Sequence, residues 1–462
     1  MTMRPRALTA LTRFGLGPRQ GEATRIASDP VGYVLSQCEA PRAAHITGDL
    51  PDRESLRAWF ADYRADLREA RRIERSGDAT EEMMEEATKV RRTAGRFARD
   101  VQWKEAMARF SHGVATDHPF VERLVLFWTD HFSVERTRGR TTRVTTGNFE
   151  REAIRPNVLG YFEDMLVDAT THPAMLIYLD NITSVGPNSR AGRRRGITSA
   201  NENLAREVLE LHTLGAGGGY TQEDVIALAA TLTGWTGGFH ARGTGGIFEP
   251  RFHEPGPRTI LGKTYTHEGA AQLEAVLPDL ASHPSTARYI AQKFARHFVS
   301  DDVSQALIDE LTDTFLVTGG DLRELAMTLI ESDHAWAGEP RKTVPPYDFM
   351  VASFRATEAK LPQPRFILDS AESLAQPLWS PPSPAGWPDA DDAFLGGDSM
   401  LERIDYARQI ANRFTRIDEV LGLAQDLFAD NLDPYMEEAI TRAEDRRQAL
   451  VLLLMSPPFP RR

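Results

Sequence analysis

The sequence is poor in cysteine, since Cys38 is the only one among 462 residues. A single thiol cannot form an internal disulfide or a cluster of thiolate metal ligands, so both kinds of site are excluded. The chain also lacks any run of the roughly 20 apolar residues that a membrane-spanning helix needs. Its first residues, MTMRPRALTALTRFGLG, are positively charged but have no apolar core before Arg13, which makes them a poor signal peptide. We therefore expect a cytoplasmic protein without a membrane span, or a periplasmic one whose leader has been removed.

Several catalytic signatures are absent as well. There is no G-x-S-x-G nucleophile elbow, no H-E-x-x-H zinc motif, no C-x-x-C and no pair of Glu-x-x-His repeats. These absences argue against a Ser-His-Asp hydrolase, a zincin and a bundle-type di-iron protein. A P-loop is excluded because G-x-x-x-x-G-K-[ST] does not occur, and the glycines at 215–219 lack the preceding strand of a dinucleotide site.

Acidic side chains outnumber basic ones, 66 against 54, which gives a formal charge of −12 at pH 7. Such a charge disfavours nonspecific association with nucleic acid, and we expect no nucleic-acid partner. Apolar residues recur at helical spacing along nearly the whole chain, and no linker-like composition interrupts them. The predicted fold class is therefore all-α, with residues 1–462 forming one large multi-helical domain.

Residues 53–110 differ from the rest because they are rich in Arg, Glu and Ala and poor in β-branched residues. They predict two long helices broken at Ser76-Gly77-Asp78, a charged helical hairpin inserted in the domain and protruding from it. Its alternating charges favour a salt-bridged, solvated surface, with docking of a protein partner as the alternative. A second departure is predicted near 240–266, where glycines, prolines and the runs GIFEPRF and RTILGKTY favour a small β-hairpin or an ordered loop.

The helix with the densest polar chemistry is predicted in SANENLAREVLELHTLGAGGGYTQEDVIALAATLTGW, residues 199–235, called the motif stretch below. The local signals agree on a helix, a glycine turn and a second helix. They are a capping box at Ser199 and Glu202 with Asn201 as an alternative cap, a terminating glycine at Gly215, and a second capping box at Thr221 and Asp224.

Four polar side chains share one face of the first helix in the motif stretch, because residues three and four apart are neighbours. They are Asn203, Arg206, Glu207 and Glu210. One interpretation is a solvated surface stripe. The other is that the face borders a buried cleft, where the two glutamates share a proton, act as acid and base, or bind a divalent cation.

Two histidines are candidates to join these carboxylates. His131 ends an apolar helix beside Asp130, where a buried imidazole can bind a metal through one nitrogen and donate from the other. The alternative is a core histidine that stabilises the end of its own helix. His253 lies on a proline-rich loop, RFHEPGPRT, which suits acid–base work or ligation, or else a hydrogen bond to turn carbonyls. His297 falls in a helical pattern and is predicted to be structural.

The loop before the motif helix contains Arg193, Arg194 and Arg195 between two glycines. Arginines beside the free N–H groups of a helix N-terminus favour an anion site for phosphate, sulfate or carboxylate, with a solvated loop as the alternative. Four tryptophans are predicted to anchor the core and loops rather than to line a pocket: Trp128, Trp235, Trp379 and Trp387.

At NENLAREVLELHTLGAGGGYTQEDVIALAATLTGW the sequence resembles a large bacterial family known as domain of unknown function 1800. Other segments resemble the same family in the same order: LTRFGLGP at 11–18, LFWTDHFSV at 126–134, HPAMLIYLDN at 172–181, FHEPGPRTILG at 252–262, HPSTARYIAQKFARHFVSDD at 283–302 and QPLWSPPSPAGWPD at 376–389. The resemblance covers nearly the whole chain. It implies a mostly helical, single-unit bacterial protein, often exported and often encoded beside a second, sulfatase-like family. This chain departs from the exported members because it has no recognisable export signal.

Together these patterns support the hypothesis of an enzyme with a carboxylate and histidine site, acting on an anionic small molecule or modified polymer. Its catalytic residues would be His131, Glu207, Glu210 and His253, and its substrate-binding residues Arg193, Arg194, Arg195, Asn203 and Arg206. The same catalytic four would be the ligands of a metal, and such a set suits Fe, Mn or Zn. A metal-dependent oxidoreductase and a hydrolase both remain open. The alternative is a non-catalytic binding or assembly protein that docks a partner, such as the product of the neighbouring gene, through the hairpin.

Overall fold

The computed structural model describes residues 6–76, 79–240, 247–338, 342–413, 420–429, 432–457 and 459–462. Over these ranges the chain forms α-helices, short 3₁₀ and π turns and a two-stranded sheet, which confirms the all-α prediction. The α-helices are α1 (Arg6–Thr12), α2 (Glu22–Ile26), α3 (Pro30–Leu35), α4 (Arg53–Arg75), α5 (Glu81–Ala115), α6 (Pro119–His131), α7 (Arg140–Phe149), α8 (Phe162–Thr171), α9 (Pro173–Tyr178), α10 (Arg190–Arg195), α11 (Asn203–Glu207), α12 (Gln222–Leu232), α13 (Ala270–Ala281), α14 (Pro284–Phe298), α15 (Gln305–Thr318), α16 (Leu322–Glu331), α17 (Asp333–Trp336), α18 (Pro346–Thr357), α19 (Pro364–Ser373), α20 (Gly397–Arg413), α21 (Val420–Phe428), α22 (Pro434–Thr441) and α23 (Arg446–Leu454).

The remaining elements are shorter. The 3₁₀ turns are η1 (Ser36–Glu39), η2 (Arg136–Arg138), η4 (Arg155–Asn157), η5 (Asn181–Thr183) and η7 (Pro250–Phe252), the π turns are η3 (Glu150–Ile154) and η6 (Val208–Thr213), and the strands are β1 (Arg258–Ile260) and β2 (Lys263–Tyr265). Within the described ranges, no helix combines the length and the apolar character that a membrane crossing requires.

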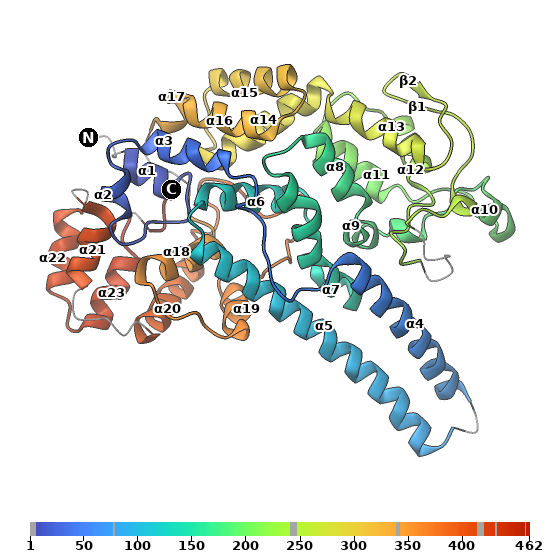
Figure 1. Cartoon of the computed structure of the whole chain (residues 1–462), viewed down its shortest axis with the longest axis horizontal. Helices are drawn as coiled ribbons and strands as arrows, with labels where there is room; N and C mark the ends of the chain where they lie inside the picture. Colours follow the sequence, from blue (N-terminus) through green and yellow to red (C-terminus); the bar gives the residue numbers. More distant parts are fainter. Residues whose placement is uncertain are drawn as a thin grey trace.

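The body contains two main hydrophobic cores. The first is built from helices between α1 and α17, and the second from the end of α5 together with α18–α23. In Figure 1 the helices of the second core lie at the lower left, below α14–α17. Helix α6 contacts both, since Phe120 and Trp128 are buried in the first core while Leu126 packs against the second. Side chains near α6 are therefore placed at the junction of the two cores.

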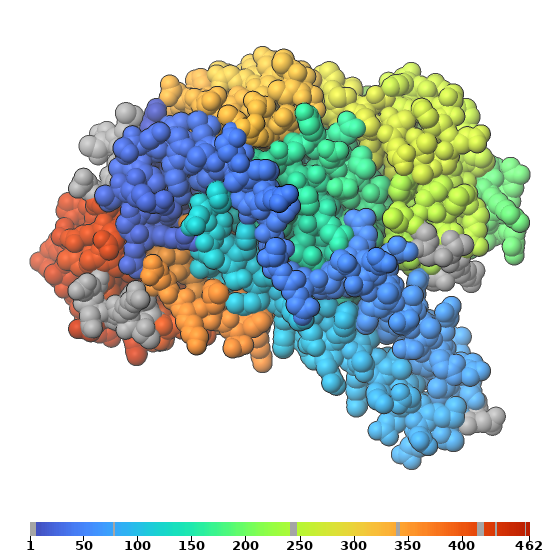
Figure 2. Space-filling model, viewed as in Figure 1, coloured from blue at the N-terminus to red at the C-terminus, as the bar shows by residue number. Residues whose placement is uncertain are grey.

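Helices α4 and α5 form the predicted hairpin, and α5 continues to Ala115, which joins the hairpin to the body. Figures 1 and 2 show the pair projecting away from the other helices. Helix α4 ends at a Ser76 cap and α5 begins after a Thr80 cap, while Gly77 and Asp78 of the predicted break lie outside the described residues. Small buried side chains let the two helices approach closely: Ala70, Ala87, Ala94 and Ala98.

The β-hairpin predicted near 240–266 is present as β1 and β2, which pair antiparallel. Leu261 and Gly262 connect them with positive φ of 49° and 75°, as a type I′ two-residue turn requires. The β-like run GIFEPRF forms no named strand over its described residues, which fits the ordered-loop alternative. Phe248 forms only an isolated bridge with Trp235, and η7 follows because Pro250 has no N–H to offer a strand. Residues 241–246 lie outside the described ranges.

In the motif stretch, the capping box predicted at Ser199 and Glu202 is wrong, because the helix begins only at Asn203. The preceding residues bond elsewhere: the backbone N–H of Asn201 donates to Ser184 Oγ at 3.2 Å. Asn201, the alternative cap, lies one residue before the N-cap Glu202, but its Oδ1 does accept from the Asn203 N–H at 3.0 Å. After α11 the helix widens into the π turn η6, where the Leu214 N–H donates to the Leu209 carbonyl at 2.9 Å.

The later signals of the motif stretch are confirmed. Gly215 has a φ of 81° and ends the helical path, and Thr221 with Asp224 forms a complete capping box at the start of α12. Residues 375–396, by contrast, contain no helix, as their prolines predict. This proline-rich segment contributes Leu378 and Trp379 to the second core, and it lines the cavity described below.

Candidate functional site

In the polar stripe of Asn203, Arg206, Glu207 and Glu210, Arg206 and Glu210 form hydrogen bonds to nearby side chains of the protein. Arg206 Nη2 donates to Glu202 Oε2 at 3.0 Å and to Gln222 Oε1 at 3.1 Å. Glu210 Oε2 accepts from the Tyr220 hydroxyl at 3.2 Å, whereas Asn203 is exposed. Burial, and next the charge of Glu210, raise the pKa of Glu207, so the two carboxylates do interact.

His131 is buried, and both of its ring nitrogens are in contact with protein groups. Nε2 lies 3.1 Å from the His212 carbonyl, which can only accept, so Nε2 must carry the hydrogen. Nδ1 lies 3.2 Å from Lys293 Nζ and accepts from that ammonium group. Burial, followed by the charges of Lys293 and His212, lowers the pKa of His131 well below its usual value. His131 is therefore a neutral imidazole whose two nitrogens are already occupied.

His253 is held in a different neighbourhood. Its Nδ1 donates to the Thr233 carbonyl at 2.9 Å, while the N–H of the next residue, Glu254, donates to Thr233 Oγ at 2.8 Å. Burial lowers the pKa of His253. No hydrogen bond or ion pair within the described residues joins His253 to His131, Glu207 or Glu210.

The predicted arginine loop is partly helical. Ser189 Oγ accepts from the Gly192 N–H at 3.0 Å and opens α10, and Gly196 ends it with a φ of 64°. All three arginines are exposed, and the Arg195 guanidinium lies 5.2 Å from the centroid of the Phe252 ring. They form the last turn of α10, eight or more residues before the start of α11, and not the approach to a helix N-terminus that was expected.

The residues proposed from the sequence thus do not gather into one hydrogen-bonded cluster. In the part of the chain that the structure describes, no three His, Cys, Asp or Glu side chains are grouped so that they could hold a metal ion. The catalytic, metal-binding and substrate-binding roles assigned to these residues stay predictions.

A different set of polar side chains surrounds a cavity of about 90 Å³ at the junction of the two cores. This volume has room for about six water molecules or for a small organic acid. Its walls come from α5, α6, α7, α14 and α18 and from the proline-rich segment. The polar side chains that line it include Arg109, Asp130, Tyr347 and His297.

Arg109 of α5 lies at the cavity with an unused hydrogen-bond donor. Its guanidinium carbon is 4.7 Å from the ring centroid of Tyr347 and 5.4 Å from that of Trp379, so the two rings hold the group by cation–π contacts. Its Nε lies 3.3 Å from Glu150 Oε2 in an ion pair. The buried Nε of Arg109 and the buried Tyr347 hydroxyl have no hydrogen-bond partner among the described residues. Buried donors of this kind are normally satisfied, so they favour an acceptor supplied by a ligand.

Asp130 of α6 lies at the same cavity, and its carboxylate is fixed by the backbone of the proline-rich segment. Oδ1 accepts from the Trp387 N–H at 2.8 Å. Gly386 has a φ of 90°, and a Cβ there would lie 2.6 Å from Asp130 Oδ2, so glycine is needed for this approach. Burial raises the pKa of Asp130 to about 7, although the Trp387 N–H and the charge of Lys293 act in the opposite direction. The group is therefore poised to exchange a proton near neutral pH.

Two buried charge networks hold the cavity in shape. Behind Arg109, Glu150 also accepts from Trp379 Nε1 at 3.1 Å and pairs with Arg155 at 2.7 Å. On the other side, Arg123 pairs with Asp348 and donates from Nη2 to His297 Nε2 at 3.0 Å. Because Nε2 accepts, the His297 hydrogen is on Nδ1, which faces Asp389 Oδ2 at 3.3 Å. His297 is fixed by both partners, in agreement with a structural role.

Sequence reasoning missed this cavity. Arg109 falls within the range assigned to the charged hairpin, and Tyr347 has no local signature. Trp379 and Trp387, predicted as anchors, line the cavity, and Trp379 is also buried. A usable signal was present, because three of the segments that resemble the family supply cavity residues: 126–134, 283–302 and 376–389.

No curated protein and no solved structure matches this chain. A family model does match, and it covers residues 9–461, nearly the whole sequence. The chain belongs to the family described as "Protein of unknown function (DUF1800)".

Proposed function

We propose that the protein is an enzyme that binds a small anionic substrate through Arg109 and uses Asp130 as a general acid or base. The observation that carries this proposal is the Arg109 guanidinium, buried at a cavity with its Nε lacking a hydrogen-bond partner among the described residues. The proposal keeps the anionic substrate and the carboxylate chemistry expected from the sequence. It moves both from the motif helix to the junction of the two cores.

The chemistry of the three groups is complementary. The planar guanidinium of an arginine can bind a carboxylate or phosphate in bidentate fashion. The Tyr347 hydroxyl adds a neutral donor that has no competing acceptor in the described protein. Asp130, with a pKa of about 7, is present in both protonation states near neutrality, as a general acid or base must be. Together they could bind an anion and move a proton within one cavity.

Calorimetric titration with phosphate, sulfate and acetate tests the binding step. Wild-type protein should bind at least one of these anions at millimolar concentration or better. Arg109→Met should abolish that binding, whereas Arg96→Met, which removes an exposed arginine of the same helix, should not. Tyr347→Phe should weaken binding about tenfold without loss of stability, because its hydroxyl has no protein partner. Equal binding by wild type and Arg109→Met would contradict the proposal.

The role of Asp130 has its own test. An ionised Asp130 repels an anion in the same cavity, so anion affinity should fall as pH rises through about 7. Asp130→Asn keeps an acceptor for the Trp387 N–H and should remove this pH dependence while the protein stays folded. An unchanged pH profile in Asp130→Asn would exclude Asp130 as the titrating group.

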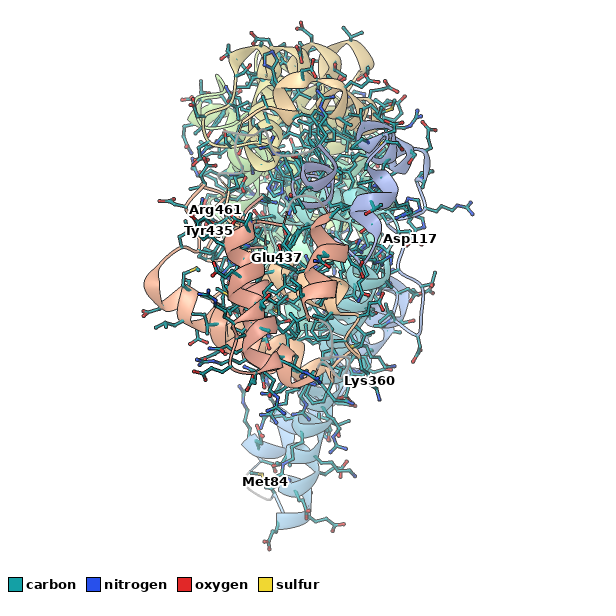
Figure 3. The ribbon with its side chains drawn as sticks, turned by 90° about the vertical axis from the view of Figure 1, so that its left-hand side faces the viewer. Met84, Asp117, Lys360, Tyr435, Glu437 and Arg461 are labelled. Carbon is teal, nitrogen blue, oxygen red and sulfur yellow. The ribbon has the colours of Figure 1, made fainter. Side chains whose placement is uncertain are left out.

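The assembly alternative is favoured by one observation, which is the exposed pair Met83 and Met84 on the far part of the hairpin, 39% and 42% accessible. Figure 3 shows Met84 well away from the body. Flexible methionines at an exposed surface suit protein contacts. A chain with residues 66–94 replaced by a short linker should still fold, and by this alternative it would lose association with the neighbouring gene's product in sedimentation experiments. Unchanged association would remove the alternative.

A further inference from the structure

The walls of the cavity differ in chemical character. The helices contribute most of its polar side chains, whereas the proline-rich segment contributes mainly apolar ones. Three prolines, Pro377, Pro381 and Pro388, belong to this apolar wall, together with the rings of Trp387 and Phe394. A ligand that fills the cavity therefore meets hydrogen-bond donors on one side and apolar surface on the other.

Trp387 and Phe394 stand out because large aromatic side chains are usually well packed. Their ring centroids are 6.3 Å apart, and both side chains remain partly exposed at the cavity. The backbone holds them there. The Trp387 N–H is bound by Asp130 at 2.8 Å, and Phe394 has a φ of 63°, which a bulky residue adopts only when its surroundings impose it.

We propose that the natural ligand is a small organic acid with a flat, apolar body, such as an aromatic monocarboxylate, and not a bare inorganic oxyanion. This inference rests on the proposed function, because Arg109 must hold the carboxylate. The apolar body would lie against Trp387, Phe394 and the prolines, whose rings can pack against the face of an aromatic ligand. A phosphate or sulfate ion would leave that wall without a complementary partner and would lose hydration against it.

The size of the cavity limits the ligand. A volume of about 90 Å³ is smaller than the roughly 150 Å³ of a cavity that encloses a benzene ring, so a single ring with one carboxylate is the upper limit, with part of the ring outside the cavity beside the partly exposed Trp387 and Phe394. Benzoate is therefore the matched probe, and acetate is the same carboxylate without the ring. The ratio of their affinities isolates the contribution of the apolar wall from that of Arg109.

Calorimetric titration of the full chain with benzoate and acetate tests the inference. Wild type should bind benzoate at least about tenfold more tightly than acetate. Burying an aromatic ring stabilises a complex by about 1.5–3 kcal/mol, whereas a tenfold difference in affinity needs only about 1.4 kcal/mol. Trp387→Ala should lower benzoate affinity about tenfold and leave acetate affinity unchanged, since the bond to Asp130 uses the backbone N–H. Trp103→Ala removes a tryptophan of α5 outside the cavity and should leave the ratio unchanged. Phe394→Leu, which keeps apolar bulk but removes a ring, serves as a second variant if Trp387→Ala does not fold.

The outcomes separate the two proposals. Equal affinities for benzoate and acetate in wild type, with acetate binding that still depends on Arg109, would overturn the inference and leave the proposed function standing. No binding of either acid, with phosphate or sulfate still bound through Arg109, would overturn the inference alone. Binding that does not depend on Arg109, or no binding of any of these anions, would overturn both. Tighter binding of sulfate than of benzoate would overturn the inference alone.

Discussion

Replacing Arg155 with methionine removes the cation at the centre of the charge network behind the cavity. The Arg155 side chain is completely buried, and its five N–H groups are all used. Nε and Nη2 donate to Glu150 at 2.9 and 2.7 Å, Nη1 and Nη2 donate to Glu122 at 2.8 and 2.7 Å, and Nη1 also donates to the Ala44 carbonyl at 2.8 Å. Methionine fills a similar length but leaves two buried carboxylates without their shared partner.

The expected cost is about 3–4 kcal/mol. Breaking a buried ion pair by removing one partner usually costs about 3–5 kcal/mol, because an uncompensated charge remains in the interior. Arg109 still faces Glu150 at 3.3 Å, and His112 faces Glu122 at 3.4 Å, so the lower part of that range applies. A domain is stable by only about 5–15 kcal/mol, so the loss is a large fraction of the total.

Urea unfolding followed by circular dichroism measures this loss at pH 7 and pH 5. The deficit of Arg155→Met should shrink at pH 5, because carboxylates that have lost their cation protonate more readily and no longer carry the charge. Arg408→Met is the matched control. It breaks an exposed pair with Asp405 and should cost less than about 1 kcal/mol. A deficit below about 1 kcal/mol in Arg155→Met, or one that is the same at both pH values, would refute the reasoning.

Three further predictions follow from single residues. Burial lowers the pKa of His172 to about 4, below the unfolded value of 6.5. About 3 kcal/mol of stability should therefore be lost as pH falls from 6.5 towards 4. His172→Asn keeps an acceptor for the Ala174 N–H, and its thermal unfolding should show a smaller loss of stability over this pH range. Gly386→Ala puts a Cβ against Asp130 Oδ2 at a φ of 90° and should weaken anion binding, measured by calorimetry, with little change if the approach has no functional role. Lys293→Met removes a charge that lowers the pKa of Asp130, so the pH midpoint of anion affinity should move above about 7, and Lys293→Arg should restore it; a midpoint shared by all three proteins would exclude this coupling.

Local signals explain what could be predicted from the sequence. The Thr221 and Asp224 box, the helix end at Ser76 and the prolines of 375–396 act over a few residues, and they mark the start of an element, the end of one and the absence of one. The box at Ser199 failed for a non-local reason, since Asn201 bonds to Ser184 and to the Asp180 carbonyl, which delays the helix. Local patterns could not reveal these competing partners.

The cavity could not be predicted in this way because its groups come from distant parts of the chain. Arg109 looks like the other arginines of residues 53–110, and only packing against Tyr347 and Trp379, more than two hundred residues later, buries it. His131 was recognised as a special residue, but its partners, the His212 carbonyl and Lys293, are 81 and 162 positions away. Residue type and spacing singled out His131, but they could not identify the groups that its ring nitrogens contact.

Helix α14 connects the motif stretch to the cavity. Tyr289, Lys293 and His297 lie four residues apart, so they share one face of the helix. At one end Gly215 packs under Tyr289, where a Cβ would lie 2.7 Å from the ring, and at the other His297 lines the cavity. Lys293 lies between them and is held by His131, which is itself fixed by the π turn through the His212 carbonyl.

This arrangement gives the motif stretch a role that needs no contact with a ligand. Its glycine turn and π turn set the position of α14 and of the Lys293 ammonium group, whose charge acts on Asp130. A side chain at Gly215 would have to displace the Tyr289 ring, and the backbone φ of 81° there disfavours any other residue. Gly215→Ala should therefore change the pH dependence of anion binding although Gly215 is not among the residues that line the cavity, and a normal pH profile in a folded Gly215→Ala protein would separate the motif stretch from the cavity.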